Sequence, residues 1–328
     1  MQLAVSLPMV GVGLNESVDI VRESADWGYT AAWASEVAGP DFATLLGAVS
    51  NATQIDLGVA VVPVQTRSPW LLAATAASLS HLSGGRFSLG LGTSSEVIVQ
   101  QWSGVPFERP LARLRETVEV VRQMLAGEKV KHAGEFLSTS GYRLFAPPPA
   151  PVPIVVGALN DKSLRQAGAI GDGLALNQVA AEDVPAMLEQ WRAGAAEADR
   201  SVDGQPVVDR LFCLVTDQAA EARQFLRGFF APYVATSVYN RFYRAHGFAE
   251  EADAVLAAMK AGDRKAASEA VSDRLLDAVT AIGDADTVAA RVQDYIDAGV
   301  TIPVIACLGP GRDDHVRTLQ GIGDRLGG

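Results

Sequence analysis

Eight short apolar segments, each followed by a stretch with helical periodicity, constrain the fold of this 328-residue chain more than any other feature. The predicted strands lie at residues 3–7, 30–33, 55–62, 87–91, 153–156, 173–176, 207–215 and 301–308. Because these segments are apolar throughout, they indicate a parallel α/β sheet covered by helices on both faces. Eight strand–helix units favour a closed (β/α)8 barrel. A doubly wound open sheet would also alternate, but the first strand lacks a dinucleotide fingerprint.

The chain is longer than a plain barrel, which needs about 250 residues, so roughly 80 residues should form insertions. We expect the largest insertion at about residues 219–281, a helix-rich region with a cluster of aromatic side chains. Residues 130–144 have glycines spaced as in a hairpin. No linker-like composition divides the chain, so the sequence predicts a single domain over residues 1–328.

Charge and hydropathy exclude several function classes. The net charge of −11 disfavours a nucleic-acid partner, which needs a basic face. No apolar run approaches the roughly 20 residues that span a bilayer, and no basic region precedes an apolar segment at the start. We therefore expect a cytoplasmic protein without a membrane partner. Cys213 and Cys307 fall in apolar strand-like runs, where reduced, buried thiols are expected.

Residues 81–96 have the local pattern of one unit of an α/β barrel whose active site follows the carboxyl ends of the strands. The segment predicts a helix end, a stop at Gly84 and Gly85, a buried strand and then a polar loop. Since the active sites of such barrels lie at the carboxyl ends of the strands, the loop with Gly92, Thr93 and Ser94 is the first candidate site.

The predicted strand ends are rich in hydroxyl and amide side chains and poor in metal ligands. None of the four histidines, His81, His132, His246 and His315, falls at a strand end. A metal-dependent hydrolase needs clustered histidines and carboxylates, so the sequence predicts no metal site.

Residues 157–163 lead from a strand directly into a helix and could hold a phosphate. Free backbone N–H groups at a helix N-terminus bind anions, and Lys162 or Ser163 could assist. The alternative is a plain strand-to-helix turn. Barrels more often hold phosphate after strands seven and eight than after strand five.

Glu36 and Glu96 are the candidate catalytic carboxylates at the predicted pocket. A carboxylate beside an apolar cofactor face could be tuned into a general acid. The alternative for both residues is a solvated position on the surface.

These segments together resemble the luciferase-like family of flavin- and deazaflavin-dependent oxidoreductases. The most characteristic match is Leu-Ser-Gly-Gly-Arg-Phe-Ser-Leu-Gly-Leu-Gly at residues 82–92, and residues 59–69, 151–177 and 282–303 follow the same pattern. The resemblance implies a TIM barrel with insertions, usually a homodimer, that holds a flavin-type ring at the carboxyl ends of its strands.

The resemblance also assigns cofactor contacts by position. Val62 and Pro63 would line the ring at a backbone bulge with an unusual peptide, and Ser35 with Glu36 matches a polar pair after strand two. The remaining implied contacts are Gly92, Thr93 and Ser94 at the ring or ribityl chain, and Gly157, Ala158 and Asn160 near the phosphate. Leu159 and Lys162 in the same segment, and Asn177 at the next strand end, are further candidate cofactor contacts.

The chain departs from several relatives at Val37, where those that act on sugars or alcohols carry a histidine. Glu36 or Glu96 would then replace it, or solvent would supply the proton. The resemblance implies a coenzyme F420-dependent oxidoreductase that moves a hydride to or from a small organic substrate. The alternative is an FMN-dependent two-component monooxygenase, which would need a flavin reductase as partner. A third possibility is a flavin-binding relative without catalysis.

Overall fold

The computed structural model describes residues 1–327 and contains eleven strands. They are β1 (Leu3–Leu7), β2 (Tyr29–Ala34), β3 (Asp56–Pro63), β4 (Phe87–Gly92), β5 (Val130–Ala133), β6 (Ser138–Tyr142), β7 (Ile154–Gly157), β8 (Leu174–Asn177), β9 (Val207–Val215), β10 (Thr280–Gly283) and β11 (Ile302–Cys307). All eight predicted strands are present, and each boundary agrees to within one residue.

Eight strands close a parallel barrel in the order β1, β2, β3, β4, β7, β8, β9 and β11, and β11 pairs back with β1. The closing pair β8–β9 places Asn177 opposite Arg210. The prediction of a (β/α)8 barrel is confirmed, and the open-sheet alternative is wrong. Because all eight strands run in the same direction, their carboxyl ends meet at one mouth.

A short ninth strand, β10, joins the sheet and was not predicted. Strand β9 pairs with β11 along one edge, and on the other edge it pairs first with β8 and then, from Phe212 to Val215, with β10. The predicted helical insertion reached residue 281, whereas the last helix ends at Val279 and Thr280 begins this strand. A strand of four residues directly after a helix gives too short a periodic signal to read.

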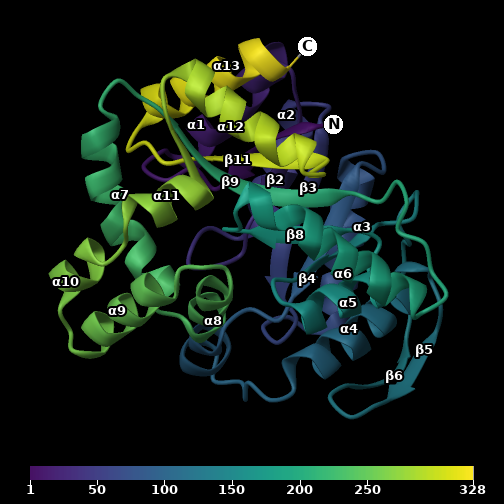
Figure 1. Cartoon of the computed structure of the whole chain (residues 1–328). Helices are drawn as coiled ribbons and strands as arrows, with labels where there is room; N and C mark the ends of the chain where they lie inside the picture. Colours follow the sequence, from purple (N-terminus) through teal and green to yellow (C-terminus); the bar gives the residue numbers. More distant parts are fainter. Residues whose placement is uncertain (328) are drawn as a thin grey trace.

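Helices surround the barrel, with several more outside this ring (Figure 1). They are α1 (Leu14–Ser24), α2 (Phe42–Ala52), α3 (Pro69–Leu82), α4 (Pro110–Leu125), α5 (Asp161–Ile170), α6 (Val184–Ala196), α7 (Ala219–Val234), α8 (Ser237–Ala245), α9 (Ala249–Lys260), α10 (Arg264–Glu269), α11 (Asp273–Val279), α12 (Ala285–Asp297) and α13 (Arg312–Leu326), with the short helical turns η1 (Ala25–Trp27), η2 (Val97–Trp102) and η3 (Ala181–Asp183).

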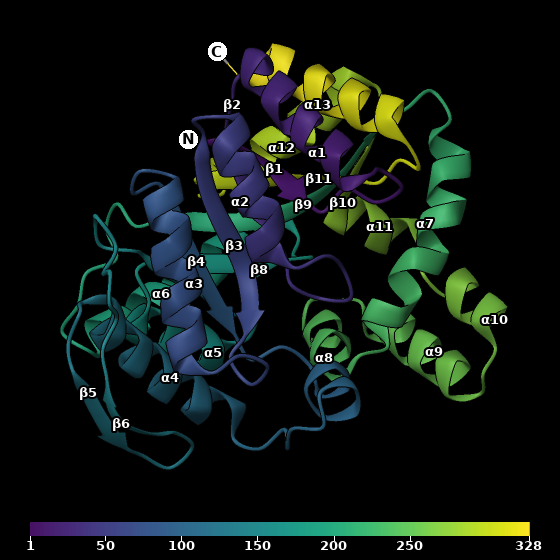
Figure 2. The same ribbon diagram turned by 180° about the vertical axis from the view of Figure 1, so that it is seen from behind.

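The extra helices form a group on one side of the barrel. Both views show α7, α8, α9 and α10 standing away from the strands, while the β5–β6 hairpin lies on the opposite side (Figures 1 and 2). The hairpin is antiparallel, as the glycine spacing predicted. Helix α8 nevertheless contacts the mouth: its Tyr243 donates a hydrogen bond to the backbone oxygen of Gln178, just beyond β8.

Strand residues alternate between the barrel interior and the helical layer outside it. The interior cluster contains Ala4, Ala31, Trp33, Val155, Ala175, Val208, Ile302 and Val304. A Cβ added to Gly58 would lie 2.5 Å from the Trp33 ring, so a glycine is needed there for this indole to fit. Cys213 and Cys307 are buried free thiols, as predicted. Within residues 1–327 no helix is long and apolar enough to cross a membrane.

Candidate active site

A β-bulge in β3 shapes the centre of the mouth. The pairing of β3 with β4 shifts register between Val59 and Val62, and the Ala60–Val61 peptide in the bulge is cis. Val61 faces the barrel interior, whereas Val62 is fully buried among the residues packed against the helices. The structure thus brings Val61, rather than the predicted Val62, to the interior surface, and the contact of Val62 with a ring stays a prediction. An extra residue in one strand shifts which side chains point inward.

Two glycines flank Val61 and leave a flat apolar surface around it. A Cβ on Gly92 would lie 2.5 Å from Cγ2 of Val61, and a Cβ on Gly157 would lie 2.9 Å from its Cγ1. Only glycine therefore fits at the ends of β4 and β7 while Val61 keeps its place. The structure thus brings Gly92 and Gly157, both predicted site residues, to the same point of the mouth.

The loop after β4 is ordered by an unusual backbone. Ser94 has a φ of 58°, a left-handed conformation that non-glycine residues seldom adopt. Such residues cluster at functional sites, where surrounding contacts hold them. Thr93 and Ser94 are half-buried, but Glu96 is exposed at the start of η2. Glu96 therefore lies in the solvated position that was the alternative to a catalytic role.

The rim beside β2 is occupied by an ion-pair network. Arg67 Nε donates to both carboxylate oxygens of Glu36, at 2.9 and 3.0 Å, and its Nη2 contacts Asp41 at 2.5 Å. Although burial lowers the pKa of Arg67, these bonds raise it overall. A carboxylate that accepts two bonds from a guanidinium is not a free proton donor, so the contacts do not support Glu36 as general acid. Ser35 donates to the backbone oxygen of Leu7.

The N-terminus of α5 is closed by its own side chains. Asn160 Oδ1 accepts from the Ser163 N–H at 3.3 Å, and Ser163 Oγ accepts from the N–H groups of Leu159 and Asn160 at 3.1 and 3.0 Å. The Ala158 N–H donates to Ala175 in the sheet. Donors that the sequence assigned to a phosphate are therefore already used in a capping box. Lys162 is exposed on the first turn.

A polar cluster lies inside the barrel at the carboxyl end, which we call the floor of the mouth. Of its residues, only Asn177 was predicted from the sequence. Asn177 Nδ2 donates to the hydroxyl of Tyr239 at 2.5 Å, and Arg210 Nε donates to Ser6 Oγ at 3.1 Å. Arg210 and Tyr239 are close enough for each to shift the pKa of the other. Burial raises the pKa of Tyr239 to about 12, so its hydroxyl keeps its proton at neutral pH. The sequence does contain a signal for this cluster, because Arg210 is an arginine within the apolar strand at residues 207–215.

The loop after β8 continues this cluster. Gln178 has a φ of 56° and is 2% exposed, and Tyr243 of α8 donates to its backbone oxygen. Of the predicted aromatic cluster, Tyr239 and Tyr243 stack at 6.2 Å, whereas Phe225 is exposed. Two tyrosines of helix α8 thus contact the end of β8 and the residue that follows it. Across residues 1–327, no three His, Cys, Asp or Glu side chains group as metal ligands.

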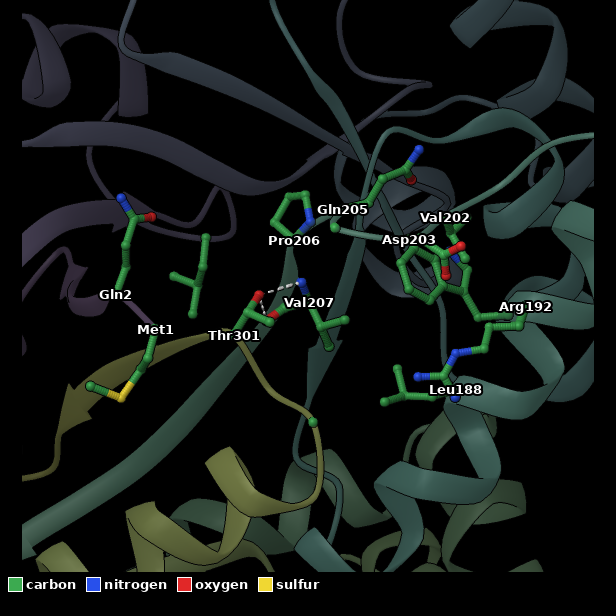
Figure 3. Close-up of a pocket in the computed structure, with 14 residues that line it drawn as sticks. Met1, Gln2, Leu188, Arg192, Val202, Asp203, Gln205, Pro206, Val207 and Thr301 are labelled. Carbon is green, nitrogen blue, oxygen red and sulfur yellow. Dashed lines mark hydrogen bonds between the residues drawn. The ribbon is translucent and has the colours of Figure 1, made fainter.

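A hollow lies at the opposite end of the barrel. It has a volume of about 360 Å³ and is lined at the strand starts by residues that include Gln2, Arg192, Asp203 and Thr301 (Figure 3). Thr301 Oγ1 accepts from the Val207 N–H at 2.8 Å. Because barrel enzymes carry their chemistry at the carboxyl ends, this hollow is separate from the candidate site.

Comparisons with known proteins agree with this geometry. The model of the luciferase-like monooxygenase family matches residues 2–301. The chain is 30% identical over 330 residues to a Mycobacterium tuberculosis protein named as a coenzyme F420-dependent oxidoreductase, covering 93% of each. It is 32% identical to the 5,10-methylenetetrahydromethanopterin reductase of Archaeoglobus fulgidus, covering 83% of this chain and 82% of the relative.

A solved structure shows the same fold over the full length. The coenzyme F420-dependent tetrahydromethanopterin reductase of Methanopyrus kandleri superposes with a TM-score of 0.84 at 24% identity. The superposition covers 99% of this chain and 98% of the reductase.

Proposed function

The chain belongs to the luciferase-like monooxygenase family, and from this premise we propose that it is a coenzyme F420-dependent oxidoreductase acting on a small organic substrate. The observation that carries the proposal is the surface formed by Val61 between Gly92 and Gly157, where no other side chain could stand without displacing Val61. A flat ring system fits such a surface. The relatives named for F420 favour the deazaflavin over FMN.

The described residues fit such a cofactor at the ring more fully than at the phosphate. Val61 would lie against the ring, Gly92 and Gly157 would allow it to approach the backbone, and Thr93 and Ser94 would contact the ring or its chain. Near the phosphate, the capping box uses the Ser163 N–H, so the Lys162 side chain and the N–H groups of Asp161 and Lys162 remain as donors. When bound, the deazaflavin supplies a ring carbon that accepts or donates a hydride.

The chain's own residues would hold the substrate and exclude water. Helix α8 closes over the floor through the Tyr239–Asn177 and Tyr243–Gln178 hydrogen bonds. Tyr239 accepts from Asn177, so its own hydrogen remains available to a ligand. Glu36 and Glu96 stay predictions for the proton donor, but one is ion-paired and the other is exposed, so Tyr239 or solvent is better placed.

A second candidate is the FMN-dependent two-component monooxygenase. The observation in its favour is the family itself, whose description is a monooxygenase. This function would require a flavin reductase as partner and would consume oxygen. A homodimer, a cytoplasmic location and a single domain also remain proposals, which rest on the sequence and the family resemblance.

A binding titration separates the two candidates. The purified protein is titrated with F420 and with FMN, each oxidised and reduced, and binding is followed by cofactor fluorescence. We expect tighter binding of F420 than of FMN, and Lys162→Ala should weaken F420 binding by about tenfold, the loss of one charge-assisted hydrogen bond. Preference for reduced FMN, with oxygen uptake when a reductase is added, would move the assignment to the monooxygenase.

A further inference from the structure

One cation inside the barrel has no anionic partner. Val208 faces the barrel interior, so Arg210, two residues further along β9, faces it as well. Asp209, its neighbour in sequence, points to the opposite side of the sheet. Arg210 forms no salt bridge with any residue that the structure describes. Alternation along the strand therefore places these two adjacent ionisable side chains on opposite sides of the sheet.

Of the three guanidinium nitrogens of Arg210, only Nε makes a hydrogen bond within residues 1–327. Its Nε donates to Ser6 Oγ at 3.1 Å, and its Cζ lies 4.8 Å from the centre of the Phe212 ring. Nη1 and Nη2 have no hydrogen-bond partner within residues 1–327, and neither is fully buried. Two terminal N–H groups in a fixed plane match the two oxygens of a carboxylate.

A third donor stands beside this pair. Tyr239 already accepts from Asn177 Nδ2, so its O–H can donate only to another group. Asn177 is the register partner of Arg210 across β8 and β9, so the Tyr239 hydroxyl that Asn177 contacts lies on the same floor. The cluster thus offers several N–H and O–H donors and carries a positive charge within a chain of net charge −11.

Arg67, a cation at the rim of this mouth, has anionic partners. Arg67 contacts the carboxylates of both Glu36 and Asp41. Leaving a partly buried charge unpaired costs folding free energy, so a persistent unpaired cation on a rigid strand indicates that a ligand supplies the missing anion.

We propose that Arg210, with Tyr239 as a further donor, binds a carboxylate of the substrate, so that the substrate class is a small organic acid. This inference rests on the proposed oxidoreductase function, because it assigns the floor of the same mouth to the substrate. Arg210 would make two parallel hydrogen bonds to the carboxylate oxygens and orient the group that exchanges the hydride.

Benzoate is a suitable probe because it joins a carboxylate to a flat apolar ring, and benzamide is its neutral counterpart. The thermal unfolding midpoint of the full chain is measured with benzoate, with benzamide and with sodium chloride at equal concentration, since a ligand that binds the native state raises it. We expect benzoate alone to raise the midpoint. Calorimetric titration should show binding weakened by about 10- to 100-fold in Arg210→Gln, the loss of charge-assisted hydrogen bonds.

Variants separate recognition from folding. Arg210→Lys should retain part of the benzoate affinity, and Arg192→Gln, which removes an exposed arginine at the other end of the barrel, should retain all of it. If Arg210→Gln does not fold, Arg210→Met, which preserves the length of the side chain, replaces it. Equal binding of benzamide, or full benzoate binding by a folded Arg210 variant, would overturn the proposal.

Adding F420 distinguishes this inference from the proposed function. If F420 binds together with benzoate, the cation serves the substrate as proposed. If F420 abolishes benzoate binding, the cation serves the cofactor and the inference fails. If the protein binds benzoate through Arg210 but does not bind F420, the anion site stands and the proposed function fails.

Discussion

The two ends of the barrel differ in a way that locates its chemistry. The amino end has the open hollow of about 360 Å³, but its strand starts are tied by hydrogen bonds such as Gln2 N–H to Thr301 O at 2.9 Å. The carboxyl end instead carries the β3 bulge, the glycines around Val61 and the unpaired Arg210. Uncompensated charge and backbone held by its surroundings therefore indicate function better than empty volume does.

Charge shows the same contrast. Arg192 at the amino end is exposed, so water solvates it and no partner is required. Arg210 lies inside the mouth, where burial lowers its pKa and little water reaches it. Substitutions at the two ends should therefore have different consequences.

The largest effect is expected from Gly92→Ala, because its Cβ would lie 2.5 Å from Val61. Overpacking of this kind costs about 1–3 kcal/mol of unfolding free energy, and F420 affinity should fall with it. Urea unfolding and cofactor titration measure the two losses. Val61→Ala in the same chain should recover part of the stability.

Gly47→Ala is the matched control for that substitution. It lies within α2 with nothing near the added Cβ, and it should stabilise the chain by about 0.5–1 kcal/mol. If Gly92→Ala behaved like Gly47→Ala, the tight contact around Val61 would not exist.

A smaller loss is expected from Arg67→Ala at the rim. This change leaves the carboxylates of Glu36 and Asp41 facing each other without a cation. Their side chains are 22% and 43% exposed, so solvent reduces the penalty to about 1–2 kcal/mol of unfolding free energy, measured in urea.

Glu36→Gln tests whether Glu36 of this ion-pair network acts as the general acid. We expect reduced stability with kcat little changed, since Arg67 occupies the carboxylate. A fall in kcat of about 100-fold or more, with a stable fold, would restore Glu36 as the general acid.

Asp209→Asn should stabilise the protein in a pH-dependent manner. Burial raises the pKa of Asp209 well above its ordinary value of 3.8, so the folded chain keeps a proton that the unfolded chain releases. Wild-type stability therefore falls as the pH rises above 3.8, at about 1.4 kcal/mol per pH unit for this group, and stops falling above its folded pKa. The advantage of the variant in urea unfolding should therefore grow as the pH rises above 3.8 and become constant above the folded pKa. A difference that does not depend on pH would contradict the burial of an unpaired carboxyl.

The smallest effect is expected from Arg192→Gln at the amino end. An exposed arginine that has no hydrogen bond or ion pair with residues 1–327 contributes within about 0.5 kcal/mol to stability, and cofactor binding should not change. A marked loss of F420 affinity in this variant would reverse the assignment of the two ends.

The fold and part of the site could be predicted because they depend on local patterns. The apolar segments gave the strands, and Gly92 and Gly157 follow β4 and β7 directly. The bulge was expected from the family resemblance and not from local periodicity, and its position brings Val61 rather than Val62 to the interior surface. The role of Glu36 depends on Arg67, which lies 31 residues away in sequence. Arg210 and Tyr239 meet only through closure of the barrel and the return of α8.

The most direct test of the central claim is a crystal structure of the protein bound to F420. The account predicts the ring at the carboxyl ends of the strands, against Val61 and between Gly92 and Gly157, with Arg210 left free for the substrate. Density for the cofactor in the amino-end hollow beside Arg192 and Thr301, or a ring away from Val61, would contradict it.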